Sequence, residues 1–360
     1  MNIITDDLVY YPLGGASYIF KDDFLKYIKT NIHKKNVIIS IGAQPNSSPH
    51  FGTLCVFSLA FSLASAIFKF TNVNCSVLFE VVDTAPGEQM KINNIIYQKN
   101  LKYSSILEKY MPEFIEILDY FSQKSKIKYK IRYQKDFNKQ DGIVETVDNI
   151  IKNQKYITKL LDASLNKLRI RISCPKCGLT DKYSIKNKYK SGKIHCFCPE
   201  HGDFVIDYHK HPEMLEYNTP LRNLIRAIIY GKINESNDYD YQIIRITGND
   251  YAGFYQEELL YKVGALLNYN ITKFPIIVYC PLVTDWSGAK LSKSLYVKEG
   301  AYKDLPKYLI NYKFLKEEYG TDGLKEIKNI TDEWINEPYK LFRDYSIYYF
   351  MKRFNDDIKK

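Results

Sequence analysis

Residues 36–82 place a long apolar segment between two short runs that are apolar almost throughout. The two runs, 36–41 and 75–82, have the composition of parallel strands that are covered on both faces. The segment between them, 54–70, predicts a buried helix. A strand, a helix and a second parallel strand connect through a right-handed crossover. The sequence therefore predicts an α/β fold built on a doubly wound parallel sheet.

The turn between the first strand and the helix reads Pro45-Asn-Ser-Ser-Pro-His50-Phe-Gly52-Thr. The N–H groups in the first turn of a helix have no partners within the helix, and the helix dipole is positive there. Such a point can hold a phosphate, and Gly52 allows close approach because it has no Cβ. A capped turn that binds nothing fits the same residues equally well.

The remaining segments continue the alternation of helices and strands. Helices are expected at 21–31, within 84–125, and at 144–167, 221–230, 254–269 and 305–360, and strands at 126–133, 241–247 and 275–282. Because ligands bind beyond the carboxyl ends of parallel strands, Glu80 and Asp83 are candidate site residues at the end of the second strand.

Two short knuckles repeat one pattern, Cys174-Pro-Lys-Cys177-Gly and Cys198-Pro-Glu-His201-Gly. Zn²⁺ prefers four tetrahedral nitrogen and sulfur ligands, and two such pairs supply them. Four protein ligands leave no position for water, so we expect the zinc to be structural. Cys196 is an alternative ligand that could replace His201 or Cys198.

The segment that separates the two parts of the sheet is too long for a loop. We therefore expect 1–83 and 236–300 to be two halves of one sheet domain. Residues 84–235 would form an inserted connective domain with a zinc ribbon at 170–208. Residues 301–360 would add a short C-terminal helical segment.

The 360 residues carry a formal charge of +10, which permits a polyanion partner without requiring one. The first residues are acidic where a secretion signal needs a basic region. The apolar window 54–68 is shorter than the ~20 residues that span a bilayer. Metal-type spacing of the cysteines is typical of a reducing compartment. We expect a cytoplasmic protein with no membrane partner.

A second basic motif, Lys290-Leu-Ser-Lys293-Ser, lies in a loop after the strand at 275–282. Two lysines three residues apart can reach a polyphosphate. Their ammonium groups neutralise charge that develops on the phosphates during displacement. A solvated loop is the alternative interpretation.

These motifs together resemble a known family. The turn at 49–53 resembles the HIGH signature of class I aminoacyl-tRNA synthetases, and the loop at 290–294 resembles their KMSKS signature. Gly248-Asn-Asp250 resembles the Gly-x-Asp element that holds the adenosine ribose. With zinc knuckles between the two halves, the chain looks most like the archaeal-type class I lysyl-tRNA synthetases.

The resemblance implies a split Rossmann-like (HUP-type) sheet that binds ATP and Mg²⁺ and carries structural Zn²⁺. It implies catalytic roles for His50, Lys290 and Lys293. It implies ATP-binding roles for Pro49, His50, Gly52, Thr53, Gly248, Asp250, Lys290, Ser292 and Lys293. It implies amino-acid contacts for Ile41, Gly42, Glu80, Asp83 and Tyr251.

Two residues depart from the family pattern: Thr53 replaces the second His of HIGH, and Tyr251 replaces a His that follows the Gly-x-Asp element. The stretch after Ser294 is too short for the family's large anticodon-binding domain. We therefore expect a truncated relative that does not read an anticodon in the usual way.

The function expected is ATP-dependent activation of lysine, or of a related amine-bearing amino acid, to an aminoacyl adenylate. The acceptor would be a tRNA acceptor end or a small-molecule or peptide acceptor, and DNA is not expected as a partner. One alternative is a catalytically inactive synthetase-like zinc-ribbon protein that binds RNA or regulates. Another is a nucleotidyltransferase that adenylates something other than an amino acid.

Overall fold

A parallel five-stranded sheet forms the centre of the computed structural model, which describes residues 24–161, 167–253, 255–291 and 305–358. All four strand pairs in this sheet are parallel. In spatial order the strands are β13 (Ile277–Cys280), β12 (Tyr241–Gly248), β1 (Asn36–Ala43), β2 (Asn74–Val81) and β5 (Tyr129–Tyr133). The α/β fold with a parallel sheet expected from the sequence is therefore confirmed.

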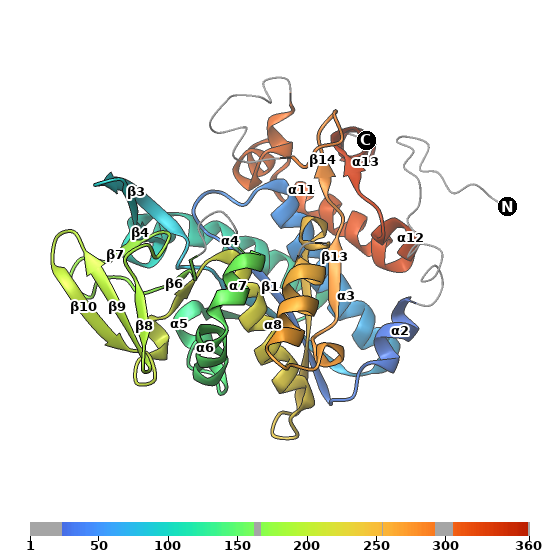
Figure 1. The fold of residues 1–360 in the computed structure, drawn as a ribbon. Coiled ribbons are helices and arrows are strands. Elements are labelled where there is room, and N and C mark those ends of the chain that lie inside the picture. Colours follow the sequence, from blue (N-terminus) through green and yellow to red (C-terminus); the bar gives the residue numbers. More distant parts are fainter. Residues whose placement is uncertain (1–23, 162–166, 254, 292–304, 359–360) are drawn as a thin grey trace.

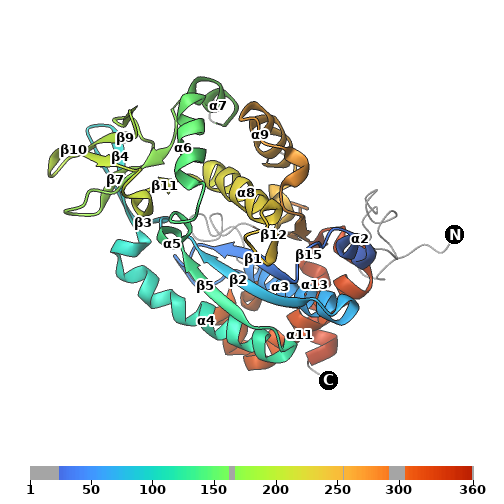
Figure 2. The same ribbon diagram turned by 90° about the horizontal axis from the view of Figure 1, so that it is seen from below.

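Helices cover both faces of this sheet (Figures 1 and 2). One face is covered by α3 (Phe51–Thr71), α4 (Ser105–Ser125), α11 (Tyr312–Asn336) and α13 (Ile347–Ile358). The other face is covered by α8 (Thr219–Glu235), with α6 (Ile143–Lys152), α7 (Gln154–Leu161) and α9 (Gly264–Leu266) on the same side. Shorter helices are α2 (Phe24–Thr30), α5 (Gln134–Phe137) and α12 (Pro338–Leu341).

The helix α3 is the apolar helix expected after the first strand. Phe57 in its middle packs edge-on against Phe79 of β2 at 5.1 Å between ring centroids, and Phe114 of α4 stacks on Phe79 at 5.7 Å. Among the described residues, α3 is the one helix long and apolar enough to cross a membrane. Two thirds of its most apolar window is buried within the protein, as in a helix that packs against a sheet core.

A β-hairpin stands where the sequence predicted the start of a helix. Within 84–125, β3 (Pro86–Ile92) and β4 (Ile95–Asn100) pair before α4 begins. The two residues between them, Asn93 and Asn94, both have positive φ angles, 46° and 63°. Two left-handed residues are what a tight hairpin turn requires, and Asn adopts that conformation more readily than most residues.

The small strands lie apart from the central sheet, where Figure 1 shows them as one projecting body. They form three sets: β3, β4 and β7 (Leu179–Asp181); β8 (Lys188–Lys190), β9 (Lys193–Cys198) and β10 (Gly202–Asp207); and β6 (Ile170–Arg171) with β11 (Glu216–Tyr217). However, β5 and α8, both within the predicted insertion 84–235, belong to the central sheet and its cover. Within 84–235 the chain therefore returns to the central sheet at β5 and to its cover at α8, between the strands of the projecting body.

Two predicted helices differ in detail. The one at 144–167 is divided into α6 and α7, and the one at 254–269 is a π-helix over Tyr255–Val263 followed by α9. The C-terminal region also contains a short strand, β15 (Tyr345–Ser346), which pairs in parallel with β14 (Val283–Thr284). This pairing joins the closing helices to the strand that follows β13.

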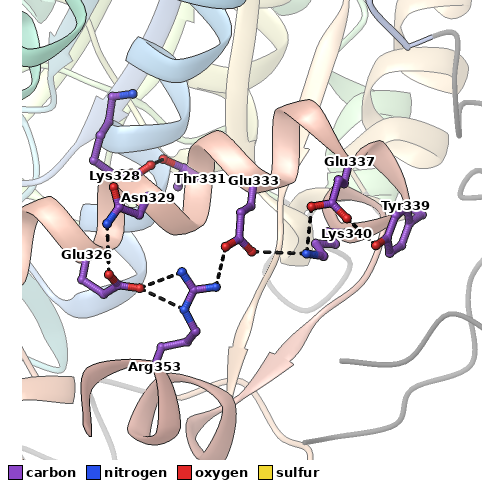
Figure 3. A network of polar contacts seen from close by, with 9 residues as sticks. All are labelled: Glu326, Lys328, Asn329, Thr331, Glu333, Glu337, Tyr339, Lys340 and Arg353. Atoms are coloured by element: carbon purple, nitrogen blue, oxygen red, sulfur yellow. Dashed lines mark hydrogen bonds and ion pairs between the residues drawn. The ribbon is translucent and has the colours of Figure 1, made fainter. Parts of the chain in front are cut away.

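Charged side chains join the closing helices to one another (Figure 3). Arg353 of α13 donates to Glu326 at 2.9 Å and to Glu333 at 2.7 Å, and both carboxylates belong to α11. On the opposite side of α11, the buried hydroxyl of Thr331 bonds to Ser58 and Ser62 of α3. The C-terminal helices are therefore part of the sheet's cover.

Removing the Phe57 ring should cost about 3–5 kcal/mol of unfolding free energy, because Phe57→Ala opens a cavity between α3, β2 and α4. Urea unfolding followed by circular dichroism measures this loss. Phe68→Ala on the same helix is the matched control, since the Phe68 side chain is 45% exposed. It should change stability by no more than about 0.5 kcal/mol. Equal losses from the two variants would contradict this packing.

Candidate active site and metal centre

The predicted site residues follow strands that end at one edge of the sheet. Residues Ala43 and Val81 are paired at the ends of β1 and β2, and β12 ends beside them at Gly248. Parallel strands bring the loops after their carboxyl ends together. The sheet therefore places the turn before α3, the residues after β2 and the loop after β12 along the same edge.

His50 caps the N-terminus of α3. Its Nδ1 accepts from the backbone N–H of Thr53 at 3.3 Å. The first helical N–H, that of Phe51, donates to the carbonyl of Ile310 at 3.3 Å. Two of the N–H groups that could have faced a phosphate are thus engaged by the protein. A Cβ at Gly52 would lie 3.2 Å from the His50 ring, so glycine lets the imidazole fold over this turn.

Pro49 is held in place by the C-terminal region, because its carbonyl accepts from the N–H of Tyr312 at 2.8 Å. His50 also forms an isolated β-bridge with Asn311. The segment 310–312 thus ties the turn down on one side. Motif patterns gave no signal of this contact, since it joins segments far apart in the sequence.

Asp250 and Lys290, predicted from separate motifs, are brought into direct contact. The Lys290 ammonium lies 2.5 Å from the Asp250 carboxylate, and both side chains are partly exposed. Asp250 and Tyr251 share the short 3₁₀ turn Asn249–Tyr251 that follows β12. A Cβ at Gly248 would lie 2.5 Å from Asp250 Oδ1, so any other residue there would displace the Asp250 carboxylate from this position.

The loop that carries Lys290 is shaped by Asp285. One carboxylate oxygen of Asp285 accepts from the backbone N–H groups of Ser287 at 2.8 Å and Ala289 at 3.1 Å. Gly288 has a φ of 81°, which favours glycine. The other two predicted residues of this motif, Ser292 and Lys293, lie outside the described residues.

Glu80 is almost fully buried, and guanidinium groups surround it. Arg132 of β5 forms a two-pronged contact with both carboxylate oxygens, and Arg226 of α8 lies 3.6 Å from Oε2. The hydroxyl of Tyr230 also donates to Oε1. Burial alone would raise the pKa of Glu80, but Arg226, Arg132 and the hydrogen bonds hold the pKa below its ordinary value. Glu80 is therefore an ionised structural anchor between β2, β5 and α8.

Asp83 lies in a different buried group. It interacts electrostatically with Lys102 and Glu216, and burial raises the pKa of its carboxyl group. Lys102 lies 2.9 Å from Glu216, which belongs to β11 in the projecting body. Asp83 thus helps to join the end of β2 to that body.

Ile41 and Gly42 are adjacent but face different surroundings. Ile41 as a whole residue is only 1% exposed and lies in the apolar core, so the structure does not bring it to a ligand. Gly42 is exposed, and a Cβ there would lie 3.4 Å from Arg226 Nη1. A ligand beside Gly42 would therefore meet the Arg226 guanidinium.

Sequence reasoning missed the arginines and the tyrosine around Glu80. Asn223, Arg226 and Tyr230 recur three and four positions apart in α8, among many apolar residues. This spacing places them on one helix face. That polar stripe was the available signal for a buried charged site.

The four residues of the two knuckles converge. Their ligand atoms (Cys174, Cys177, Cys198 and His201) all lie within 4.8 Å of one another. The Sγ atoms of Cys177 and Cys198 are 3.5 Å apart, and His201 Nδ1 lies 3.7 Å from Cys174 Sγ and 3.6 Å from Cys198 Sγ. Tetrahedral zinc bonds of about 2.0–2.3 Å give edges of about 3.3–3.8 Å. This cluster can therefore hold a zinc ion.

Backbone turns shape both knuckles. Gly178 and Gly202 have φ angles of 76° and 75° directly after the ligand pairs, a conformation that favours glycine. The alternative ligand Cys196 is not part of the cluster of ligand atoms. Its side chain packs instead in the apolar core that includes α8. All seven cysteines lie within the described residues, and none of them forms a disulfide.

No protein-family model and no curated protein matches this chain. Three solved structures similar to it are described as aminoacyl-tRNA synthetases. A Campylobacter jejuni protein assigned as an arginyl enzyme is 13% identical, covering 87% of this chain and 68% of that one at a TM-score of 0.36. The tryptophanyl enzyme of Plasmodium falciparum is 14% identical, covering 89% of this chain and 78% of that one at a TM-score of 0.37. A glutamate enzyme of Elizabethkingia anophelis is 10% identical, covering 86% of this chain and 67% of that one at a TM-score of 0.39.

Replacing Glu80 by Gln should lower the free energy of unfolding by about 3–5 kcal/mol at neutral pH, since two buried guanidinium groups lose their carboxylate. The folded pKa of Glu80 is depressed, so its stabilising contribution is complete above the ordinary value of 4.5 and is lost as the pH falls through the lower folded pKa. In urea titrations, the difference in unfolding free energy between wild type and Glu80→Gln should therefore become smaller as the pH falls below 4.5 towards the lower folded pKa of Glu80.

The matched control is Glu145→Gln, because Glu145 is 75% exposed in its ion pair with Lys232. This variant should change stability by no more than about 0.5 kcal/mol at any pH. A difference between wild type and Glu80→Gln that stays constant from neutral to acid pH would rule out the ionised anchor.

Purified protein should contain one zinc per chain by inductively coupled plasma mass spectrometry. Cys198→Ser should lose most of that zinc and unfold at a lower temperature, because metal binding contributes to the stability of such sites. Cys196→Ala should keep the metal, since Cys196 lies outside the ligand cluster. Retention of zinc by Cys198→Ser together with its loss from Cys196→Ala would reverse the assignment.

Proposed function

We propose that this protein activates an amino acid with ATP, forming an aminoacyl adenylate and pyrophosphate. The observation that carries this proposal is the contact between Asp250 and Lys290 at 2.5 Å. Two motifs that were matched independently to parts of one ATP site meet in space at the carboxyl edge of a parallel sheet. That agreement supports the proposal more than either motif could alone.

The residues divide the work by charge. The Asp250 carboxylate is suited to accept hydrogen bonds from the ribose hydroxyls. His50 and the backbone at Gly52 would face the phosphates from the start of α3. Lys290 and Lys293 would neutralise the α-phosphorus as the amino-acid carboxylate attacks in line and pyrophosphate leaves. This mechanism needs no protein nucleophile, because positioning and electrostatics supply the catalysis.

The remaining predicted contacts keep supporting roles in this proposal. Pro49, Thr53, Gly248 and Ser292 would shape the ATP site, and Tyr251 would border the amino acid. Mg²⁺ would accompany the phosphates, and Zn²⁺ would hold the knuckles. The acceptor of the activated group would be a tRNA acceptor end, a small molecule or a peptide. We place the reaction in a reducing cytoplasm, where unpaired zinc-ligating thiols persist.

A second candidate function is a synthetase-like RNA-binding module without catalysis. The projecting sheet supports it, because Lys188, Lys190 and Lys193 are exposed there together with His195 and Phe197. Basic side chains beside an exposed aromatic ring suit single-stranded RNA. This function predicts RNA binding that weakens steeply with salt but no pyrophosphate exchange.

Amino-acid-dependent exchange of radiolabelled pyrophosphate into ATP tests the catalytic function. We expect exchange with at least one amino acid, and a loss of about 100-fold in kcat for Lys290→Ala and for Lys293→Ala, because each removes a positive charge that stabilises the transition state. Lys273→Ala is the control, since Lys273 is 53% exposed and lies 4.0 Å from Glu235, outside the site.

The absence of exchange across the standard amino acids and their amine-bearing analogues would reject the catalytic function. Exchange that is unchanged in Lys290→Ala and Lys293→Ala would keep the function but reject the mechanism. A circular dichroism spectrum matched to wild type should accompany each variant, so that a loss of activity is not a loss of fold.

A further inference from the structure

A band of polar side chains lies between the central sheet and α8. On the sheet, Ser40 of β1 pairs in register with Arg245 of β12, and Gly42 of β1 pairs with Glu80 of β2. Glu80 in turn pairs with Arg132 of β5. These positions alternate along the strands with residues of the apolar core, so they share the face that α8 covers. From α8, the band receives Asn223, Arg226 and Tyr230.

The charges in this band do not balance. Three guanidinium groups, those of Arg132, Arg226 and Arg245, face one carboxylate, that of Glu80. Arg132 has partners for its charge and its donors, because it hydrogen-bonds to both carboxylate oxygens of Glu80 and donates to the Tyr230 hydroxyl at 3.1 Å. The described part of the chain supplies no second carboxylate to the other two arginines.

Arg226 has spare capacity for an anion. Its side chain is only 4% exposed, yet its Nε atom has no hydrogen-bond partner. Its Nη2 donates to the neutral amide oxygen of Gln134 at 3.1 Å and lies 3.6 Å from Glu80. The ring of Phe137 lies against the guanidinium at 5.3 Å. A buried guanidinium with an unpaired donor is costly unless a ligand completes it.

Arg245 also lacks a carboxylate partner among the described residues. Its guanidinium donates to the amide oxygen of Asn223, and none of the described carboxylates forms an ion pair with it. Burial and the nearby charge of Arg226 lower the pKa of Arg245. Two like charges held together in this way attract an anion between them.

A second buried ionic group in the same protein has equal numbers of positive and negative charges. There, Asp83 and Glu216 face Lys102 and Arg171, two charges of each sign. That group joins the sheet to the projecting body, and its charges balance. Of these two buried ionic groups, the band under α8 is the one that carries excess positive charge.

We propose that Arg226 and Arg245 bind a carboxylate on the side chain of the substrate, so that the amino acid activated here is acidic. This inference rests on the proposed function, because it names the substrate of that site. The two-pronged shape of guanidinium matches a carboxylate. Gly42 supplies the access, since it is exposed and lies directly beside Arg226. Glutamate and aspartate are the acidic amino acids of the standard set.

An acidic substrate replaces the amine expected from the sequence. An ammonium group would need a free carboxylate, and both oxygens of Glu80 are engaged by Arg132 and Tyr230. It would also enter a region that already carries an excess of two positive charges. Lysine is therefore expected to be among the poorest substrates.

Pairs of amino acids that differ only in charge give the sharpest test. Pyrophosphate exchange should run at least about tenfold faster, as kcat/KM, with glutamate than with glutamine or with aspartate than with asparagine, and lysine should be inactive. A charge-assisted hydrogen bond contributes enough for such a ratio. Equal rates within both pairs, or a preference for lysine, would overturn the proposal.

Arg245→Gln and Arg226→Gln test the proposed carboxylate-binding site directly. Each should raise KM for the acidic substrate and lower its preference over the matched amide by about tenfold to 100-fold, with a smaller change in kcat. Arg353→Gln is the control, since it removes an arginine that is paired with Glu326 and Glu333 in the C-terminal helices. It should lower stability without changing the ratio. If the preference for the acidic substrate over its amide is unchanged in both Arg245→Gln and Arg226→Gln, the proposal is overturned.

Isothermal titration calorimetry without ATP separates this proposal from the proposed function. Binding of glutamate or aspartate that is lost in Arg245→Gln would support the carboxylate-binding site. This result would hold even if no amino acid supported exchange and the catalytic function failed. Inorganic phosphate is titrated in parallel. Binding of phosphate in place of either amino acid would overturn the carboxylate assignment.

Discussion

The pairing of β1 with β12 on one side and β2 on the other is the constraint on which the site depends. Ser40 lies in register with Arg245 on one side and with Leu78 on the other, although the whole projecting body lies between β2 and β12 in sequence. Because all three strands run in the same direction, their carboxyl ends open onto one edge. Motifs separated by most of the chain can then act on one ligand.

Burial of charge is the second constraint. Glu80 is almost fully buried between the sheet and α8, and an isolated ionised carboxylate there would be strongly unfavourable. Arg132 and Arg226 compensate it from β5 and α8, and so fix how α8 lies on the sheet. A helix placed by apolar contacts alone could shift with little cost, whereas a buried hydrogen-bonded ion pair requires one register. Arg226, which helps to place the helix, also contributes with Arg245 to the excess of positive charge beside Gly42.

The parts of this protein that sequence patterns predicted are the local ones. Apolar runs predicted β1, β2, β12 and β13, and the short spacing of Cys174 and Cys177 predicted half of a metal cluster without any tertiary information. The hairpin at 86–100 was missed because Gln89, Lys91, Gln98 and Lys99 interrupt the apolar alternation along its strands. The segment at 129–133 was predicted as a strand, but its place in the sheet is decided by pairing with β2, which composition does not encode. Glu80 was identified from its place at a strand end, yet its partners come from β5 and α8 and became visible only in three dimensions.

The two ionic groups at the sheet edge also differ in how easily they can open. The pair between Asp250 and Lys290 is partly exposed, with side chains 29% and 45% accessible, and such pairs contribute only about 0–1 kcal/mol. ATP could separate them at little cost, because ribose hydroxyls would replace the lysine on Asp250 and phosphates would replace the aspartate on Lys290. The Glu80 group cannot open in this way, since Glu80 and Arg226 are almost fully buried and separating them would leave a buried charge without its partner. The edge of the sheet thus combines two ionic groups. The buried group at Glu80 is fixed and can recognise the charge of a substrate, whereas a nucleotide can displace the exposed pair of Asp250 and Lys290. This division suits an enzyme that must select one small molecule accurately while admitting and releasing ATP in every cycle.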